Sequence, residues 1–398
     1  MNILEQIRKE LPWLDDKVSY DLTRGKPSKA QLDITQKNLK RITQPFEMDD
    51  MDLRNYGAPE GLPSARKLGA KIMGTLANET LALDNSSLTL IQQVLSCGYF
   101  LGFEQSKLNN KSKFICPVPG YDRHFKLIEN FGIEMLPIPF SDDGPDLLAL
   151  EKVLNEDSNV SGIVCVPRHS NPTSHTYTNA NVENMFSLIS KRKKDFMILW
   201  DNAYACHDLK PTINQDCVNN VARKFGVWNN LFHFSSTSKI TLAGSGISFL
   251  SMSSANIKKF IDYRNSVTPG PNKMNQGLHV KYFNEVSLEQ QMDRLKEIIL
   301  PKFDLVENYL SELKQDQLGE YISPTGGYFF SFSSKKGRAK KIISLCNELG
   351  LKLLPVGSCH PYSNDLTDST IRIAPTFPDI ESLDRCMQIF SKVVKYLN

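Results

Sequence analysis

Phe196-Met-Ile-Leu-Trp-Asp-Asn-Ala-Tyr204 is the stretch that decides the fold of this chain. Its first five residues are apolar throughout, which is typical of a parallel strand that is buried on both faces. Ligands of open α/β sheets bind beyond the carboxyl ends of such strands. We therefore expect an α/β protein in which Asp201, directly after the strand, points into a cleft. A helix N-cap or a loop turn is the alternative role for Asp201.

An alternation of apolar strand-like runs with helical patterns extends from about Asn85 to Asn265 and predicts a parallel sheet flanked by helices. The expected strands are residues 114–118, 135–139, 162–166, 196–200, 231–234 and 247–252. The expected helices between them include residues 122–130, 182–192 and 218–225. Pro269-Gly-Pro271 ends the alternation, and a long helix over 275–313, bent near Pro301, is expected to follow.

The length of the chain predicts two domains, because 398 residues are more than one hydrophobic core usually serves. Residues 46–290 would form a large domain around the sheet. The C-terminal part predicts a smaller α+β domain, with a strand at 328–332, a helix at 338–349, a strand at 371–374 and a closing helix at 380–396. This small domain is expected to comprise residues 291–398 together with residues 1–45.

Lys239 lies in Phe234-Ser-Ser-Thr-Ser-Lys-Ile-Thr-Leu-Ala-Gly-Ser-Gly246, among small hydroxyl residues and glycines that follow an apolar strand. Taken alone, a lysine after a strand usually faces water. A lysine that forms a Schiff base with pyridoxal phosphate, however, works with a carboxylate that keeps the pyridine nitrogen protonated. Because Asp201 precedes Lys239 at the end of a neighbouring strand, the pair indicates a pyridoxal phosphate site.

Two further polar residues also lie beyond the ends of expected strands. Tyr204 stands three residues beyond Asp201, and Asn171 follows the expected strand at 162–166. A phenol and an amide at these positions can hydrogen-bond the same ring oxygen of the cofactor. Asn-Pro alone is only a turn signal. Three strand ends that bear Asn, Asp and Lys in this order are a more specific pattern.

Motifs of two lengths extend this pattern along the chain. The short ones are Asn171-Pro-Thr173, Asp201-x-x-Tyr204, Ser236-x-x-Lys239, Gly326-Gly-Tyr-Phe329 and Ile371-Arg-Ile373. The long ones are Asp21-Leu-Thr-Arg-Gly-Lys-Pro-Ser28, Arg54-Asn-Tyr-Gly57, Pro119-Gly-Tyr-Asp-Arg-His-Phe125 and Ser236-Thr-Ser-Lys-Ile-Thr241. Over nearly the whole chain, the sequence resembles the class I aminotransferases of fold type I, and the long strings are most similar to Ic-type aspartate aminotransferases. The resemblance implies a large domain with a mostly parallel seven-stranded sheet flanked by helices, and a smaller α+β domain.

The resemblance also implies roles for individual residues. Lys239 would carry pyridoxal phosphate and shuttle the proton of the substrate Cα, with Asp201 and Tyr204 as further catalytic residues. The other cofactor-binding residues would be Asn171, Tyr121, Ser86, Ser87, Ser236 and Tyr56. The substrate would contact Arg372, Gly25 and Asn171. Tyr121 would stack on the cofactor ring, and an ordinary packed aromatic side chain is its alternative role.

Two positions depart from the family pattern. The arginine that usually follows the Schiff-base lysine and binds the cofactor phosphate is missing from Ile240-Thr-Leu-Ala-Gly-Ser-Gly-Ile-Ser248. Phosphate binding would then depend on hydroxyls and backbone amides, for which Asn85-Ser86-Ser87, before a long helical pattern, is the candidate. Plain N-capping is the alternative role for the two serines. The second departure is Ser174 in place of the common glycine, which removes no catalytic group.

Arg372 lies in the apolar stretch Thr370-Ile-Arg-Ile-Ala374, where an unpaired guanidinium would be costly to bury. The resemblance implies the substrate α-carboxylate as its partner, and a salt bridge between domains is the alternative. A dicarboxylate such as aspartate or 2-oxoglutarate needs a second cation, for which the motifs offer Arg24, Lys26, Arg123 and Arg264. We therefore expect transamination between aspartate and a 2-oxo acid. The alternatives are lyase, decarboxylase or racemase chemistry, and transamination of alanine or aromatic amino acids.

The segment around Tyr56 is relevant to whether the chain forms a dimer. Its segment, Arg54-Asn-Tyr-Gly-Ala-Pro-Glu-Gly-Leu62, resembles the one in which a tyrosine reaches across a two-fold dimer to the phosphate of the neighbouring subunit. The resemblance thus implies a homodimer with shared active sites. A tyrosine packed within its own chain is the alternative.

The composition of the chain argues against several other classes of protein. With 47 basic and 44 acidic residues, the net charge of +3 implies no nucleic-acid partner. The first residues are typical of an amphipathic helix rather than a signal sequence, and no apolar run approaches membrane-spanning length, so we expect a cytoplasmic enzyme. The eight cysteines and seven histidines form no metal-ligand pattern. Too few residues precede Asp21 for a DNA-binding module, which disfavours a regulatory protein that binds pyridoxal phosphate without turnover.

Overall fold

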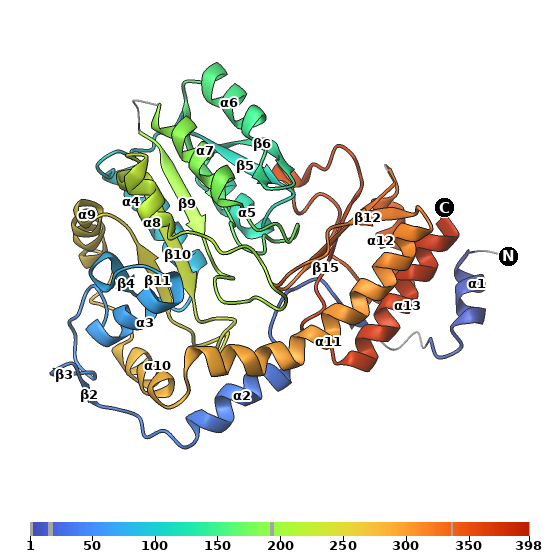
Figure 1. Ribbon diagram of the computed structural model, residues 1–398, viewed down its shortest axis with the longest axis horizontal. Helices are drawn as coiled ribbons and strands as arrows, with labels where there is room; N and C mark the ends of the chain where they lie inside the picture. Colours follow the sequence, from blue (N-terminus) through green and yellow to red (C-terminus); the bar gives the residue numbers. More distant parts are fainter. Residues whose placement is uncertain (1–2, 15–18, 192–194, 336, 398) are drawn as a thin grey trace.

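An eight-stranded sheet forms the centre of the computed structural model, which describes residues 3–14, 19–191, 195–335 and 337–397 (Figure 1). The strand order is β4-β11-β10-β9-β8-β5-β6-β7. The strands are β4 (Thr80–Ala82), β5 (Lys113–Val118), β6 (Glu134–Ser141), β7 (Gly144–Pro145), β8 (Val160–Cys165), β9 (Met197–Asp201), β10 (Leu231–Ser236) and β11 (Ser248–Ser251). All six strands expected from the sequence are among them.

The sheet is mostly parallel, as expected. Strands β6, β5, β8, β9 and β10 pair in parallel, whereas β11 is antiparallel to both β10 and β4. The expected number of seven strands is wrong by one, because the two-residue strand β7 adds an antiparallel edge to β6. The carboxyl ends of the parallel strands lie at one edge, which is where ligands of such sheets bind.

Helices cover both faces of this sheet. One face packs against α4 (Ser87–Phe100), α5 (Asp122–Asn130) and α9 (Ser254–Asn265), and the other against α6 (Leu147–Glu156), α7 (Asn179–Ser190) and α8 (Val218–Lys224). The expected helix at 182–192 begins earlier, at Asn179, because the side chain of Thr178 caps it. Its expected last residue, Arg192, lies outside the described residues.

The single long helix expected at 275–313 is two helices, α10 (Lys273–Glu285) and α11 (Leu288–Gln315). Val286 is extended and ends α10, and Ser287 begins α11 with a capping box that involves Gln290. Pro301 lies within α11, which continues past it. In Figure 1, α11 runs from the side of α10 to the C-terminal part of the chain.

The C-terminal part forms the expected α+β arrangement. It contains an antiparallel sheet in the order β12-β13-β15, and the helices α12 and α13. The bounds are β12 (Gly319–Tyr321), β13 (Phe330–Ser334), α12 (Ala339–Glu348), β15 (Thr370–Ile373) and α13 (Ile380–Leu397).

The N-terminal segment packs on this C-terminal part. The hydrophobic cluster formed by α11, α12 and α13 includes Ile7 of α1 (Ile3–Glu10), and β1 (Tyr20–Asp21) pairs in parallel with β14 (Leu351–Lys352). A separate cluster contains buried residues of α3 (Pro63–Met73). The remaining elements among the described residues are α2 (Lys29–Leu39), β2 (Glu47–Met48), β3 (Met51–Asp52) and three short 3-10 helices, η1 (Ala77–Glu79), η2 (Trp228–Asn230) and η3 (Pro361–Ser363). We propose that residues 1–45 and 291–398 form the small domain and that residues 46–290 form the large one.

None of the described helices is both long enough and apolar enough to span a membrane.

Candidate active site

A cavity of about 540 Å³ opens at the carboxyl ends of β9 and β10. Ten of the predicted cofactor- and substrate-binding residues line it: Gly25, Ser86, Ser87, Tyr121, Asn171, Asp201, Tyr204, Ser236, Lys239 and Arg372. The eleventh of these residues, Tyr56, is 80% exposed and does not line the cavity. Residues that are far apart in the sequence therefore meet in one place.

Lys239 lies three residues beyond the end of β10. The loop that carries it is fixed by the buried Thr237, whose hydroxyl accepts a hydrogen bond from the backbone N–H of Ile247 at 2.9 Å. Nζ of Lys239 is 5.1 Å from the ring centroid of Tyr204. Desolvation lowers the pKa of the Lys239 amine, and the negative charge of Asp201 opposes this shift. The cavity thus favours the neutral amine that a nucleophilic lysine needs.

Asp201 ends β9, and its two carboxylate oxygens differ. Oδ2 lies 2.9 Å from Nε2 of His124, which is in the first turn of α5. Oδ1 is buried and has no hydrogen-bond partner among the described residues. An unpaired buried carboxylate oxygen is costly, so this atom fits a protonated nitrogen. His124 was not among the residues predicted from the sequence, although it lies in the string from Pro119 to Phe125, three residues beyond Tyr121.

Tyr204 and Tyr121 also line the cavity. Tyr204 is 3% exposed, and desolvation holds the pKa of its phenol well above the ordinary value. Tyr121 is the N-cap residue of α5, and burial raises its pKa to about 12. Its ring meets that of His124 edge-on, with 4.8 Å between the ring centroids. Both phenols are therefore neutral hydrogen-bond donors at neutral pH.

The N-terminus of α4 borders the cavity at Ser86, Ser87 and Leu88. Ser86 occupies the N-cap position, but its side chain makes no capping hydrogen bond. The hydroxyl and the free N–H groups of the first turn can therefore bind an anion. Ser238, which had not been predicted, also lines the cavity and donates from Oγ to the backbone oxygen of Asn85 at 3.1 Å. It lies inside the Ser236-x-x-Lys239 motif, but its spacing carried no separate signal.

Arg372 lies on β15, and its side chain is 4% exposed. Nη2 donates to the backbone oxygen of Thr23 at 2.8 Å, and Nη1 donates to Oδ1 of Asn171 at 3.2 Å. The anionic partner that burial requires is Asp122, whose Oδ1 is 2.9 Å from Nη1. The guanidinium carbon lies 4.9 Å from the ring centroid of Phe329.

The four candidate cations for a second carboxylate are placed differently. Arg24, Lys26 and Arg123 line the cavity. Nζ of Lys26 lies 3.7 Å from the ring centroid of Phe377. Arg264 is buried away from the cavity and pairs with Asp84 at 2.9 Å, so it is not a candidate in this arrangement.

Gly25 is required for packing. A Cβ atom at this position would come within 2.3 Å of Cζ of Phe329. Any larger residue would push the loop from Thr23 to Lys26 away from the aromatic ring that also faces Arg372. The glycine thus lets the loop backbone lie close to the cavity.

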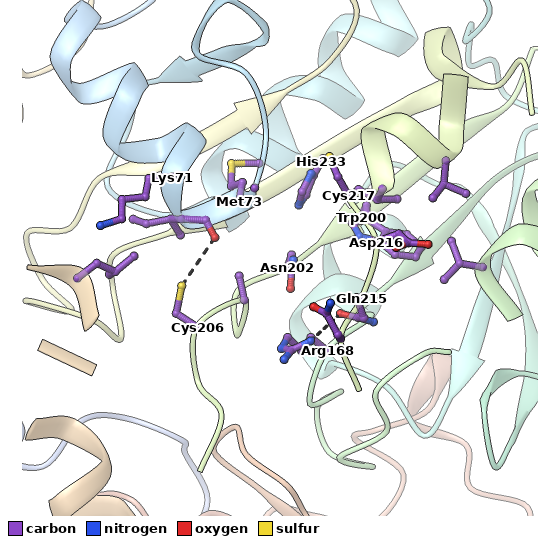
Figure 2. A pocket seen from close by; sticks show the side chains of 18 of the residues that line it. Lys71, Met73, Arg168, Trp200, Asn202, Cys206, Gln215, Asp216, Cys217 and His233 are labelled. Atoms are coloured by element: carbon purple, nitrogen blue, oxygen red, sulfur yellow. Dashed lines mark hydrogen bonds between the residues drawn. The ribbon is translucent and has the colours of Figure 1, made fainter. Parts of the chain in front are cut away.

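A second cavity, of about 690 Å³, lies on the other side of β9 (Figure 2). Because successive side chains of a strand point in opposite directions, Trp200 and Asn202 face this cavity whereas Asp201 faces the first. None of the sequence-predicted site residues line the second cavity. Two of its charged residues form ion pairs, Lys71 with Glu289 and Arg168 with Asp208. The first cavity, which the predicted residues line, is therefore the candidate active site.

Several known proteins are similar to this chain over most of its length. A family model described as "Aspartate amino-transferase" matches residues 13–397. A putative aminotransferase of Mycolicibacterium smegmatis is 38% identical over 381 residues, which cover 91% of this chain and 87% of that protein. The aspartate aminotransferase of Corynebacterium glutamicum is 36% identical over 394 residues, covering 96% and 90%. The crystal structure of a putative aminotransferase from Corynebacterium diphtheriae superposes with a TM-score of 0.91 at 36% identity, covering 98% of each chain.

Proposed function

The chain belongs to the aspartate aminotransferase family of pyridoxal-phosphate enzymes, and from this premise we propose that it transfers the amino group of aspartate to a 2-oxo acid such as 2-oxoglutarate. The observation that carries the proposal is the meeting of Lys239, Asp201 and Arg372 in one cavity. These three residues provide an amine, a carboxylate and a guanidinium, which suit the aldehyde and pyridine nitrogen of the cofactor and the carboxylate of an amino acid.

The residues of the cavity fit pyridoxal phosphate. The unpaired Oδ1 of Asp201 would accept a hydrogen bond from the protonated pyridine nitrogen, and His124 would hold Oδ2 in place. Tyr204 and Asn171 would hydrogen-bond the ring oxygen, and Tyr121 would cover one ring face. Ser86, Ser87, Ser236 and the first turn of α4 would hold the phosphate in place of the missing arginine.

When bound, the cofactor supplies an electron sink for the carbanion that forms at the substrate Cα. The chain supplies the remaining steps. Arg372 binds the α-carboxylate and so orients the Cα–H bond towards Lys239. With its amine free, Lys239 would accept the proton from Cα and pass it to the cofactor, and it would move a proton in the opposite direction in the second half of the reaction. Because burial lowers the pKa of Lys239, a larger fraction of its amine is unprotonated and able to act as this base.

A panel of amino donors tests the proposed specificity. With 2-oxoglutarate as the acceptor, we expect kcat/KM to be highest for aspartate, because only a dicarboxylate can bind both Arg372 and a second cation. The measurement compares aspartate, alanine and phenylalanine in the same coupled assay. Equal rates for all three would refute the aspartate assignment and leave the aminotransferase family unaffected. Release of ammonia or carbon dioxide instead of a 2-oxo acid would favour lyase or decarboxylase chemistry.

Arg24 and Arg123 are the cations that we propose for the distal carboxylate, since both line the cavity and both are exposed. Replacing the residue that binds the distal group by methionine should lower kcat/KM for aspartate by about 10- to 100-fold, the value of a hydrogen bond to a charged group. Alanine, which lacks that carboxylate, serves as the internal control and should be affected little. If neither Arg24→Met nor Arg123→Met changes the ratio of aspartate to alanine activity, both assignments fail.

Tyr56 supports a proposal about assembly. Nζ of Lys273 binds the backbone oxygens of Asn55 and Tyr56 at 2.5 and 2.8 Å, so the loop is anchored while the tyrosine ring stays exposed. We propose that the chain forms a homodimer in which Tyr56 reaches the phosphate site of the other subunit.

Complementation tests this assembly. Lys239→Ala and Tyr56→Ala chains should each have low activity, and co-expression of the two should restore part of it, because a hybrid dimer contains one site with both residues intact. The measurement is activity after separation of hybrids by two affinity tags. A monomeric and fully active wild-type protein would contradict the proposal.

A further inference from the structure

Asp122 is a carboxylate inside the active-site cavity that the proposed reaction does not use. It lies in the first turn of α5, directly after the N-cap residue Tyr121. Its Oδ1 lies 2.9 Å from Nη1 of Arg372. The Asp122 side chain is 27% exposed, whereas that of Arg372 is 4% exposed. One end of this ion pair is thus fixed in the protein, and the other end borders open space.

The hydrogen bonds of Arg372 show which N–H donor of its guanidinium Asp122 occupies. A guanidinium has five N–H donors. Nη2 donates to the backbone oxygen of Thr23, and Nη1 donates to Asn171 and Asp122. Nε is buried without a partner among the described residues. Both protons of Nη1 are therefore in use, so a carboxylate that binds at this nitrogen must displace Asp122 or Asn171. Of the two, Asp122 is the anionic group, which repels an incoming carboxylate and borders the cavity.

The negative charge of Asp122 also stabilises the buried guanidinium of Arg372. A buried guanidinium without an anion is costly, and the nearest other groups, the backbone oxygen of Thr23 and the amide of Asn171, are neutral. Asp122 neutralises Arg372 and holds its planar group against the ring of Phe329. Because its side chain is partly exposed to the cavity, Asp122 can turn away without disturbing the helix.

We propose that Asp122 is a positioning residue that competes with the substrate α-carboxylate for Nη1 of Arg372. This inference rests on the proposed function. It keeps the guanidinium oriented and yields its place when substrate binds. The competition weakens carboxylate binding, so the charge of Asp122 sets the KM for every amino acid without entering the chemical step.

Direct binding to the holoenzyme tests the competition. The probes are propionate and succinate, unreactive mono- and dicarboxylates, titrated calorimetrically into the wild type and Asp122→Asn. The variant keeps the shape and an oxygen acceptor but lacks the charge, so it should bind both probes about two- to fivefold more tightly, the range expected for a partly exposed ion pair. KM for the amino donor should fall by a similar factor, and kcat should change less.

Two variants serve as matched controls. Asp122→Glu keeps the charge and should keep the weak binding of the wild type. Glu129→Gln removes one negative charge from the same helix, where Glu129 pairs with Lys126 rather than Arg372, and should leave both dissociation constants unchanged. Thermal unfolding checks that each variant is folded, and Asp122→Ser replaces Asp122→Asn if the latter is not.

The possible outcomes separate this inference from the proposed function. Equal or weaker carboxylate binding by the folded, uncharged variant would overturn the competition while transamination still stood. Tighter binding by Glu129→Gln to the same degree would overturn it as well, because the effect would then be one of net charge. If propionate and succinate bind to none of the proteins, Arg372 is not a carboxylate site, and both the inference and the proposed substrate recognition fail.

Discussion

Replacing Lys239 by alanine is expected to lower transamination by about 10⁴-fold or more, the upper end of what a general base contributes. The loss is this large because one side chain has two tasks, attachment of the cofactor and transfer of the Cα proton. Borohydride reduction of the wild-type protein followed by peptide mapping should place the cofactor adduct on Lys239. The same treatment of Lys239→Ala should give no adduct.

Lys302 provides a control for this prediction. It is also a buried lysine, and desolvation lowers its pKa to about 8. Its Nζ donates to the backbone oxygen of Thr376 at 2.8 Å and lies outside the cavity lining. Lys302→Met should therefore retain the adduct on Lys239. An adduct on Lys302, or on no lysine at all, would refute the assignment of Lys239.

Replacing Arg372 by alanine is expected to lower kcat/KM by about 10²- to 10³-fold, the usual loss when one partner of a buried charged pair is removed. The decrease should be similar for aspartate, alanine and phenylalanine, because all three carry the α-carboxylate. Arg372→Lys should lie between the wild type and the alanine variant, since a lysine keeps the charge but cannot form two parallel hydrogen bonds. Steady-state kinetics with the three donors provide the measurement.

A purely structural role for Arg372 would give a different result. Its ion pair with Asp122 joins β15 to α5, so loss of the guanidinium should also lower the unfolding temperature. If Arg372→Ala lowers that temperature but leaves kcat/KM within a factor of about two, the side chain is a structural salt bridge and not the carboxylate site.

Much of the sheet could be predicted because its strands are short apolar runs buried on both faces, as at 196–200. The short strands β4 and β7 have three and two residues, which is too short for such a pattern. The break between α10 and α11 could have been read from Ser287-Leu-Glu-Gln290, a capping-box sequence that a continuous helical pattern obscured.

The residues that line the cavity could be predicted from motifs at strand ends. The contacts between pairs of these residues could not. Asp122 and Arg372 are 250 positions apart, and His124 and Asp201 are 77 apart. No spacing or periodicity connects residues at such distances, because their contact depends on how α5 and β15 pack beside the sheet. Tyr56 differs from these residues, because its proposed role in a second subunit rests on the resemblance of its segment and not on any contact within the chain.

The helix α11 contacts two of the hydrophobic clusters of the molecule. Met292 packs against both the cluster that contains Ile7 and the cluster that contains Leu53. One residue added to this helix would turn everything beyond it by about 100° and shift it by about 1.5 Å. Such a change would rotate the segment that carries Arg372 away from Lys239. The length of α11 is therefore more tightly constrained by the active site than the lengths of the surface loops.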